Sequence, residues 1–222
     1  MSSRDAILGR VRRALADVRQ DDTPYDEIID RSYLREHGHR SVEETVDLLA
    51  ENLADYRALV HRCTEEELPE VLMRLLAERG STSVLVPPQL PHSWLKAVDA
   101  TRVHDRANST PHELDRVDSV VTGCALAIAE TGTIVLDGSP DQGRRRITLV
   151  PDHHICVVRV PGQVVSSVPQ GLERLDPARP MTWISGPSAT SDIELDRVEG
   201  VHGPRTLEVV LVSGQPRAEV VP

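Results

Sequence analysis

The sequence contains very few aromatic residues: among 222 residues there are two Trp, three Tyr and no Phe. Hydrophobic residues still make up 39% of the chain, which is enough for a domain of this length to bury a full core. The core must therefore be built from Val, Leu, Ile and Ala. We interpret the chain as a single large domain preceded by a helical extension.

Cysteines are also scarce, and their spacing argues against two kinds of site. Cys63, Cys124 and Cys156 include no CxxC pair and are odd in number. Such a pattern suggests neither a disulfide framework nor a cysteine-ligated metal cluster. We therefore expect a reducing compartment and no metal site in this chain.

Long hydrophobic segments are absent as well. No run reaches the roughly eighteen consecutive apolar residues that a membrane-spanning helix needs. The N-terminus leads into a charged amphipathic stretch and not into an apolar signal region. These features predict a cytoplasmic protein without a membrane span.

The charge balance is acidic: 25 Lys and Arg against 35 Asp and Glu give a net charge of −10. A chain of this charge repels phosphate backbones, so nucleic acid is not an expected partner. Two local basic clusters remain, at Arg10, Arg12 and Arg13 and at residues 144–146. Either could hold a small anion, but solvated surface charge is the favoured interpretation.

The common cofactor and catalytic fingerprints are missing. The chain contains no GxGxxG, GxxxxGK[ST], GxSxG or HExxH sequence, the patterns typical of nucleotide sites, hydrolase nucleophiles and zinc proteases. No cofactor is therefore expected in this chain.

Hydrophobic periodicity predicts helices in the first third of the chain. Apolar residues recur at helical spacing over residues 7–18 and 42–60. Residues 20–40 have weak periodicity and predict a long connection. Capping boxes mark helix starts at Ser41, at Thr64 and, with a following Pro, at Thr110. The helix from about residue 65 to 79 ends at Gly80.

The rest of the chain predicts an α/β fold. Short apolar segments indicate strands at residues 82–86, 117–121, 125–129, 133–136, 147–150, 155–160, 182–185 and 207–212, and a helix at 164–175. Helices alternating with buried strands favour a three-layer arrangement, in which a mostly parallel sheet is covered by helices on both faces. The segments on either side of Thr131-Gly132 predict an antiparallel hairpin.

Polar loops next to the predicted strands are the best candidates for a site, because ligands of α/β sheets gather beyond the carboxyl ends of strands. Residues 186–194 combine small residues, hydroxyls and carboxylates. They suit either an anion-binding nest or an ordinary turn held by its own side chains, and these alternatives are evenly matched. The candidate residues of this loop are Gly186, Pro187, Ser188, Thr190, Asp192 and Glu194.

Three further positions carry candidate acid–base groups. Glu130, followed by Thr131, Gly132 and Thr133, would have a raised pKa and suit proton transfer if buried, whereas a solvated turn residue is the simpler interpretation. His154 and the His202-Gly203 pair are candidates for proton carriers or hydrogen-bond donors and not for metal ligands.

Four segments together resemble the LUD (lactate utilisation) domain family. They are residues 127–133 (AIAETGT), 152–155 (DHHI, with His154 at the matching histidine), 186–194 (GPSATSDIE) and 201–204 (VHGP). The resemblance covers roughly residues 70–213, and the N-terminal helices are similar to those of the C-type subunit. We accordingly divide the chain into a helical extension, residues 1–62, and a LUD-type α/β domain, residues 63–222.

The resemblance implies a fold similar to the sugar-phosphate isomerase and CoA-transferase superfamily. It also implies a subunit of a system that oxidises L-lactate to pyruvate, with the iron–sulfur clusters in partner subunits. The resemblance thus implies that the chain contributes a carboxylate-binding site formed by the loops at residues 130–133, 186–194 and 202–204. The catalytic candidates are Glu130, Asp192 and His202, and the chain alone is expected to be inactive. A homo-oligomer is compatible with this role.

Two alternatives stay open at this stage. The fold analogy allows a self-sufficient transferase or isomerase with Glu130 as base or acyl acceptor, although fold analogy is a weak argument for function. A non-catalytic scaffold subunit is the other alternative.

Overall fold

The computed structural model describes residues 2–18, 24, 27, 34–106, 108–190, 198–199 and 203–214. It consists of two compact units, Met1–Leu34 and Arg35–Pro222. The boundary predicted from the sequence lies later, after residue 62. The first unit contains helix α1 (Ser3–Ala14), whose N-cap Ser2 forms a capping box with Asp5. In the described part of the chain, no helix is long and apolar enough to cross a membrane.

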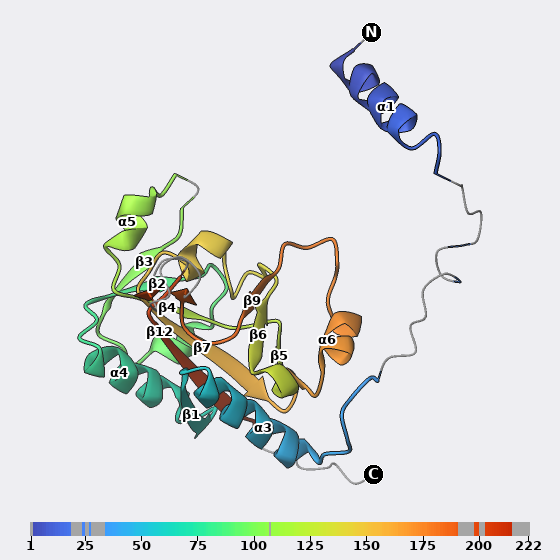
Figure 1. The fold of residues 1–222 in the computed structure, drawn as a ribbon. Coiled ribbons are helices and arrows are strands. Elements are labelled where there is room, and N and C mark those ends of the chain that lie inside the picture. Colours follow the sequence, from blue (N-terminus) through green and yellow to red (C-terminus); the bar gives the residue numbers. More distant parts are fainter. Residues whose placement is uncertain are drawn as a thin grey trace, which may run out of the picture. The chain divides into compact units, whose positions relative to one another are not determined.

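A six-stranded sheet forms the centre of the second unit (Figure 1). Every neighbouring pair of strands in this sheet is parallel, which confirms the predicted mostly parallel arrangement. In spatial order the strands are β1 (Leu59–Thr64), β12 (Thr206–Ser213), β7 (His153–Val160), β4 (Ser119–Thr122), β2 (Ser83–Val86) and β3 (Thr101–His104).

Helices cover both faces of this sheet, as the sequence predicts. One face packs against α4 (Leu68–Glu78) and the 3-10 turn η1 (His92–Leu95). The other face packs against α3 (Val42–Asp55), a second sheet, the short helix α5 (Pro111–Asp115) and the 3-10 turn η3 (Arg145–Thr148). Apart from Trp94 and the three cysteines, the buried hydrophobic side chains are all aliphatic, so the predicted aliphatic core is confirmed.

The predicted hairpin belongs to the second, four-stranded sheet. Strands β5 (Leu126–Ile128) and β6 (Thr133–Leu136) pair antiparallel, joined by the 3-10 turn η2 (Ala129–Thr131). The order of the sheet is β8-β5-β6-β9. Its outer strands are β8 (Val164–Val165) and β9 (Thr182–Ile184), and α6 (Val168–Arg174) packs on it. A two-stranded ladder joins β10 (Ala189–Thr190) to β11 (Val198–Glu199).

Two predicted helix boundaries and one predicted strand were wrong for local reasons. The helix predicted to include Val60 ends at Asp55, because Arg57 has a positive φ of 68° and turns the chain into β1. Residues 147–150 do not form a strand, since η3 occupies residues 145–148. The helix predicted from residue 164 begins only at Val168, where Ser167 caps it.

The predicted capping boxes all form. The Ser41 and Thr110 side chains accept hydrogen bonds from the backbone N–H of Glu44 and Glu113, and both boxes begin helices. At Thr64 the backbone N–H donates to Glu67 Oε2 at 2.9 Å, but the box stabilises a turn, and α4 starts after it at Leu68.

Candidate functional site

Several of the sequence-predicted loop residues line one cleft of about 270 Å³. His154 and Leu207 are the second residues of β7 and β12, so the cleft lies at the amino ends of these central strands. For β7 and β12 this corrects the expectation of a site beyond the carboxyl ends of strands, whereas Gly186, Pro187 and Ser188 do follow the carboxyl end of β9. The predicted residues in its lining are His154, Gly186, Pro187, Ser188 and Gly203, and the others include Arg145, Thr148, Trp183, Ser185 and Pro204.

The two loops of the cleft are held by the backbone. The N–H of Ser188 donates to the carbonyl oxygen of Pro204 at 2.8 Å, which joins the loop after β9 to the loop before β12. Gly186 has φ +81°, and a Cβ atom there would lie 2.2 Å from the carbonyl oxygen of Tyr56. Only glycine fits where α3 ends against this loop.

His154 presents a neutral imidazole to the cleft. Its Nε2 lies 2.8 Å from Thr122 Oγ1, and the ring is buried. Burial, together with the charge of the neighbouring His153, lowers the pKa of His154 to about 3. The ring therefore stays uncharged at neutral pH. An uncharged ring fits the predicted role of a hydrogen-bonding group better than that of a proton carrier.

Arg145 supplies a positive charge at the cleft, and sequence reasoning did not single it out. Within the basic cluster, Arg144 and Arg146 are turned to Asp105: Arg144 Nε lies 2.5 Å from Asp105 Oδ2, and Arg146 Nη2 lies 3.3 Å from Asp105 Oδ1. Arg145 instead lines the cleft. Among the described residues no ion pair involves Arg145, so its charge is available to a ligand.

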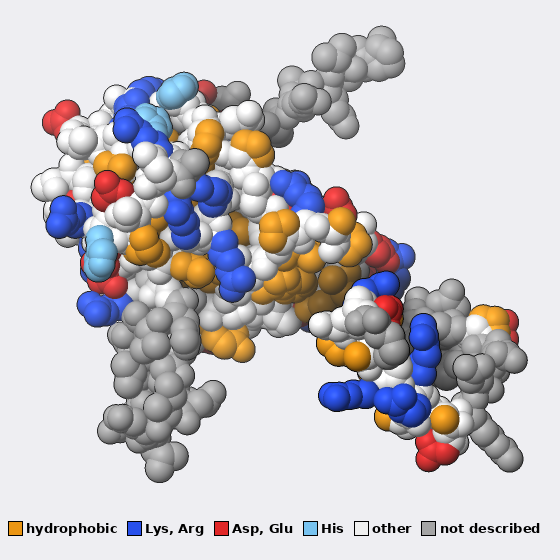
Figure 2. Space-filling view, turned by 90° about the horizontal axis from the view of Figure 1, so that it is seen from above, with side chains coloured by type: hydrophobic (Ala, Val, Ile, Leu, Met, Phe, Trp, Pro, Cys, Tyr) orange, Lys and Arg blue, Asp and Glu red, His pale blue; other side chains and the backbone are white. Residues whose placement is uncertain are grey.

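Basic side chains are prominent on one face of the molecule despite the net charge of −10. Figure 2 shows Lys and Arg side chains spread among hydrophobic ones on this face. The overall acidity of the chain therefore does not prevent local attraction of a small anion.

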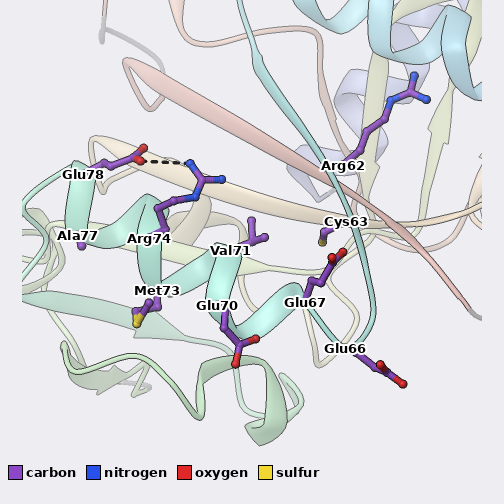
Figure 3. Close-up of a pocket in the computed structure, with 10 residues that line it drawn as sticks. All are labelled: Arg62, Cys63, Glu66, Glu67, Glu70, Val71, Met73, Arg74, Ala77 and Glu78. Carbon is purple, nitrogen blue, oxygen red and sulfur yellow. Dashed lines mark hydrogen bonds and ion pairs between the residues drawn. The ribbon is translucent and has the colours of Figure 1, made fainter.

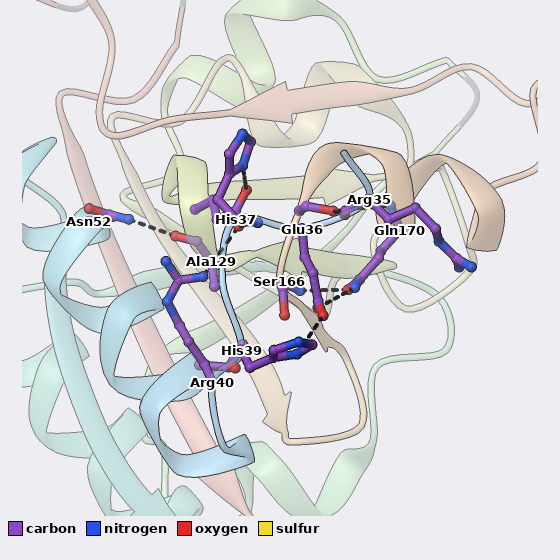
Figure 4. Close-up of polar contacts among 12 residues, drawn as sticks. Arg35, Glu36, His37, His39, Arg40, Asn52, Ala129, Ser166 and Gln170 are labelled. Atoms are coloured by element: carbon purple, nitrogen blue, oxygen red, sulfur yellow. Dashed lines mark hydrogen bonds and ion pairs between the residues drawn. The ribbon is translucent and has the colours of Figure 1, made fainter. Parts of the chain in front are cut away.

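Glu130 does not line the cleft. It contacts His37 and Arg40, two residues of the segment labelled in Figure 4. Its Oε1 accepts a hydrogen bond from the N–H of His37 at 2.9 Å, and Arg40 Nη1 lies 3.3 Å from the same oxygen. Burial alone would raise the pKa of Glu130, but these contacts and that of the His37 ring outweigh it, and the pKa is lowered. Glu130 is partly buried, but it does not have the raised pKa expected for a buried position.

The residues after Glu130 are linked to the cleft by hydroxyl groups. Thr131 Oγ1 donates to Thr133 Oγ1 at 2.8 Å, and Thr133 Oγ1 lies 2.8 Å from Ser185 Oγ, which lines the cleft. Gly132 has φ +55°, and a Cβ atom there would lie 2.7 Å from the backbone of Asn52. The hairpin turn is thus packed against α3, and its Thr133 hydroxyl contacts Ser185 in the lining of the cleft.

Four of the predicted site residues lie wholly or partly outside the described part of the chain. Asp192, Glu194 and His202 lie outside the described residues, and Thr190 is described only as part of the backbone of β10. Their predicted roles stay predictions.

A buried hydrogen-bond network on the α4 face of the sheet was also not predicted from the sequence. His153 Nδ1 lies 2.7 Å from Ser119 Oγ, His153 Nε2 lies 2.9 Å from Glu208 Oε1, and Glu208 Oε2 lies 2.6 Å from His61 Nε2. The order resembles a Ser–His–acid triad, but Ser119 is fully buried and no substrate can reach it. This hydrogen-bond network links the four neighbouring strands β4, β7, β12 and β1, and we assign it a structural role.

Taken together, fold and cleft define an α/β protein in which a parallel sheet covered on both faces carries a small polar cleft. The sequence matches the LUD domain family over residues 46–212, and the chain belongs to this family. The resemblance stated from the four segments is thereby confirmed.

Known relatives share most of their length with this chain. Lactate utilization protein C of Deinococcus radiodurans is 46% identical over 173 residues, covering 76% of this chain and 80% of that protein. Lactate utilization protein C of an Exiguobacterium species is 30% identical over 203 residues, covering 80% and 86%. A crystal structure of a DUF162 family protein from Deinococcus radiodurans has a TM-score of 0.67 and 40% identity, covering 78% of this chain and 99% of that one.

Proposed function

We propose that this chain is a subunit of a lactate utilisation system that oxidises L-lactate to pyruvate with iron–sulfur partner subunits, and that its cleft binds the small carboxylate. The observation that carries the proposal is the lining of the cleft. An arginine without an ion pair to any described residue, a neutral histidine and serine hydroxyls surround about 270 Å³. The names of the relatives support lactate as the substrate.

The lining suits a small hydroxy acid or keto acid. A guanidinium such as that of Arg145 binds a carboxylate through two parallel hydrogen bonds. The neutral ring of His154 can form a hydrogen bond with the hydroxyl or carbonyl oxygen of the ligand while remaining uncharged. Leu149 and Leu207 provide apolar contacts for a methyl group. Drug-sized ligands need roughly 300–1,000 Å³, so the cleft is sized for a small metabolite.

The oxidation itself needs a partner. Converting a 2-hydroxy acid into a 2-oxo acid releases two electrons and two protons, and the electrons require an acceptor. Cys63, Cys124 and Cys156 are all buried and unbridged, and the described residues hold no group of three His, Cys, Asp or Glu placed to bind a metal. The residues present do not fit a cluster, so we assign the iron–sulfur groups to partner subunits.

Substrate binding can be measured directly by titrating the purified chain with L-lactate and with pyruvate in a calorimeter. Arg145→Gln should weaken binding of either carboxylate by about tenfold or more, because a charge-assisted bond contributes about 1.5–3 kcal/mol. Arg116→Gln, the same change on the exposed end of α5, is the matched control and should bind normally. Equal binding by both variants would exclude the cleft as the carboxylate site.

The role as a subunit has its own test. A tagged chain is purified from cells grown on lactate, and the iron content and lactate oxidation of the co-purifying proteins are measured. We expect iron and activity in the complex and neither in the isolated chain. Arg145→Gln should retain the iron and lose turnover. Lactate oxidation by the pure chain would contradict the proposal.

A further inference from the structure

Helix α1 carries an exposed hydrophobic stripe with basic flanks. Ile7, Val11 and Leu15 are 60%, 47% and 56% exposed, and their spacing of four residues places them on one face. Within Ser3–Ala14 there are four arginines and one acidic residue. At about 100° per residue, Arg10 and Arg12 lie on opposite sides of the stripe. Such a helix suits an apolar groove with acidic edges.

A groove of that kind lies between β1 and α4 (Figure 3), with a volume of about 800 Å³. It is open along the edge of the molecule, because β1 is the last strand on its side of the six-stranded sheet. The apolar part of its lining comprises Cys63, Val71, Met73 and Ala77, and the charged part comprises Arg62, Glu66, Glu67, Glu70, Arg74 and Glu78.

The charge of this groove is negative once its own ion pairs are considered. Arg74 pairs with Glu78 at 3.1 Å, and Arg62 pairs with Asp47 at 2.6 Å. Both basic side chains are therefore already neutralised by carboxylates of their own chain. No hydrogen bond or ion pair joins the Glu70 side chain to a described residue, and Met73 beside it is 41% exposed. The groove thus offers an uncompensated carboxylate next to exposed apolar surface.

We propose that α1 of one copy of this chain binds the groove between β1 and α4 of a second copy. The hydrophobic stripe of α1 covers Val71 and Met73, and the arginines beside the stripe lie near the carboxylates of the groove. Because each copy has one helix and one groove, two copies satisfy both in a closed, symmetric pair. The charge complementarity of the two surfaces is the argument for a second copy as the occupant.

The test is a charge exchange, measured by sedimentation velocity on the full-length chain. The wild type should form dimers whose dissociation constant rises with salt. Arg10→Glu and Glu70→Arg each place like charges at both contacts and should weaken the dimer by about tenfold. When the two variants are mixed, each contact again joins opposite charges, so the mixture should form dimers as the wild type does. Glu51→Arg, on the exposed side of α3, is the control and should not change the dimer.

The apolar part of the contact has a separate measurement. Val11→Ser should also weaken the dimer, while circular dichroism shows whether the variant keeps its helix content. A wild-type chain that stays monomeric at all accessible concentrations would overturn the proposal. So would equal weakening by Glu51→Arg and Glu70→Arg, or a mixture of the charge variants that does not dimerise.

Discussion

Replacing Glu208 with Gln should destabilise the fold at neutral pH and much less in acid. The Glu208 carboxylate is buried between His153 and His61, at 2.9 Å and 2.6 Å from their Nε2 atoms. Burial alone would raise the pKa of Glu208. The hydrogen bonds and charges of the two histidines outweigh burial and lower the pKa from 4.5 to about 2.

The size of the effect follows from this difference. A pKa lowered from 4.5 to about 2 corresponds to about 3 kcal/mol of folding free energy. Because the pKa is lower in the folded state, this stabilisation is fully present above a pH of about 4.5 and is lost as the pH falls toward about 2. Gln cannot ionise, so the variant lacks it at every pH. The difference between wild type and variant should shrink to about 1 kcal/mol near pH ~3.

Urea unfolding at several pH values measures this difference. Glu51→Gln, which removes an exposed carboxylate from α3, is the matched control and should change the free energy of unfolding by less than about 0.5 kcal/mol. If Glu208→Gln were as stable as the wild type at neutral pH, or if its deficit did not shrink on acidification, the proposed stabilisation by the ionised Glu208 carboxylate would be refuted.

Three further changes test other parts of the structure. Gly186→Ala places a Cβ 2.2 Å from the carbonyl oxygen of Tyr56 and should lower the melting temperature far more than Gly138→Ala, which has a similar φ but open space and should cost only about 1–2 kcal/mol. Glu130→Gln should raise hydrogen exchange at the His37 amide by about tenfold, measured by mass spectrometry, because a bond to a charged acceptor is lost. Leu53→Ala should reduce the free energy of unfolding by about 2–5 kcal/mol in urea, because this side chain is fully buried.

Sequence patterns predicted those elements whose structure is set by residues close together in the sequence. The hairpin of β5 and β6 follows from two apolar segments around Gly132, and the helix starts follow from capping boxes. β1 was missed because Val60 continues the helical spacing of α3, and the positive φ of Arg57 that ends this helix has no signature in a non-glycine residue.

The candidate site was predictable only in part, because its geometry depends on tertiary structure. The loops at Gly186 and Gly203 were recognised from their composition, and the structure brings them to one cleft with His154. The position at the amino ends of β7 and β12 was not foreseen, since the loop after β9 belongs to a different sheet. Arg145 could not be distinguished from Arg144 and Arg146 in the sequence, because the direction in which each side chain points depends on the tertiary structure.

The position of α3 has a consequence for how this protein can tolerate change. Asn52 approaches Gly132, and Tyr56, four residues later, approaches Gly186, so a single helical turn fixes the spacing between the hairpin turn and the ligand loop. Inserting one residue between these positions would rotate Tyr56 about the helix axis by about 100° relative to Asn52. The contacts of α3 with Gly132 and with Gly186 could then no longer form together. Natural variation in chain length should therefore be found before Asn52 or after Tyr56, and not within this turn.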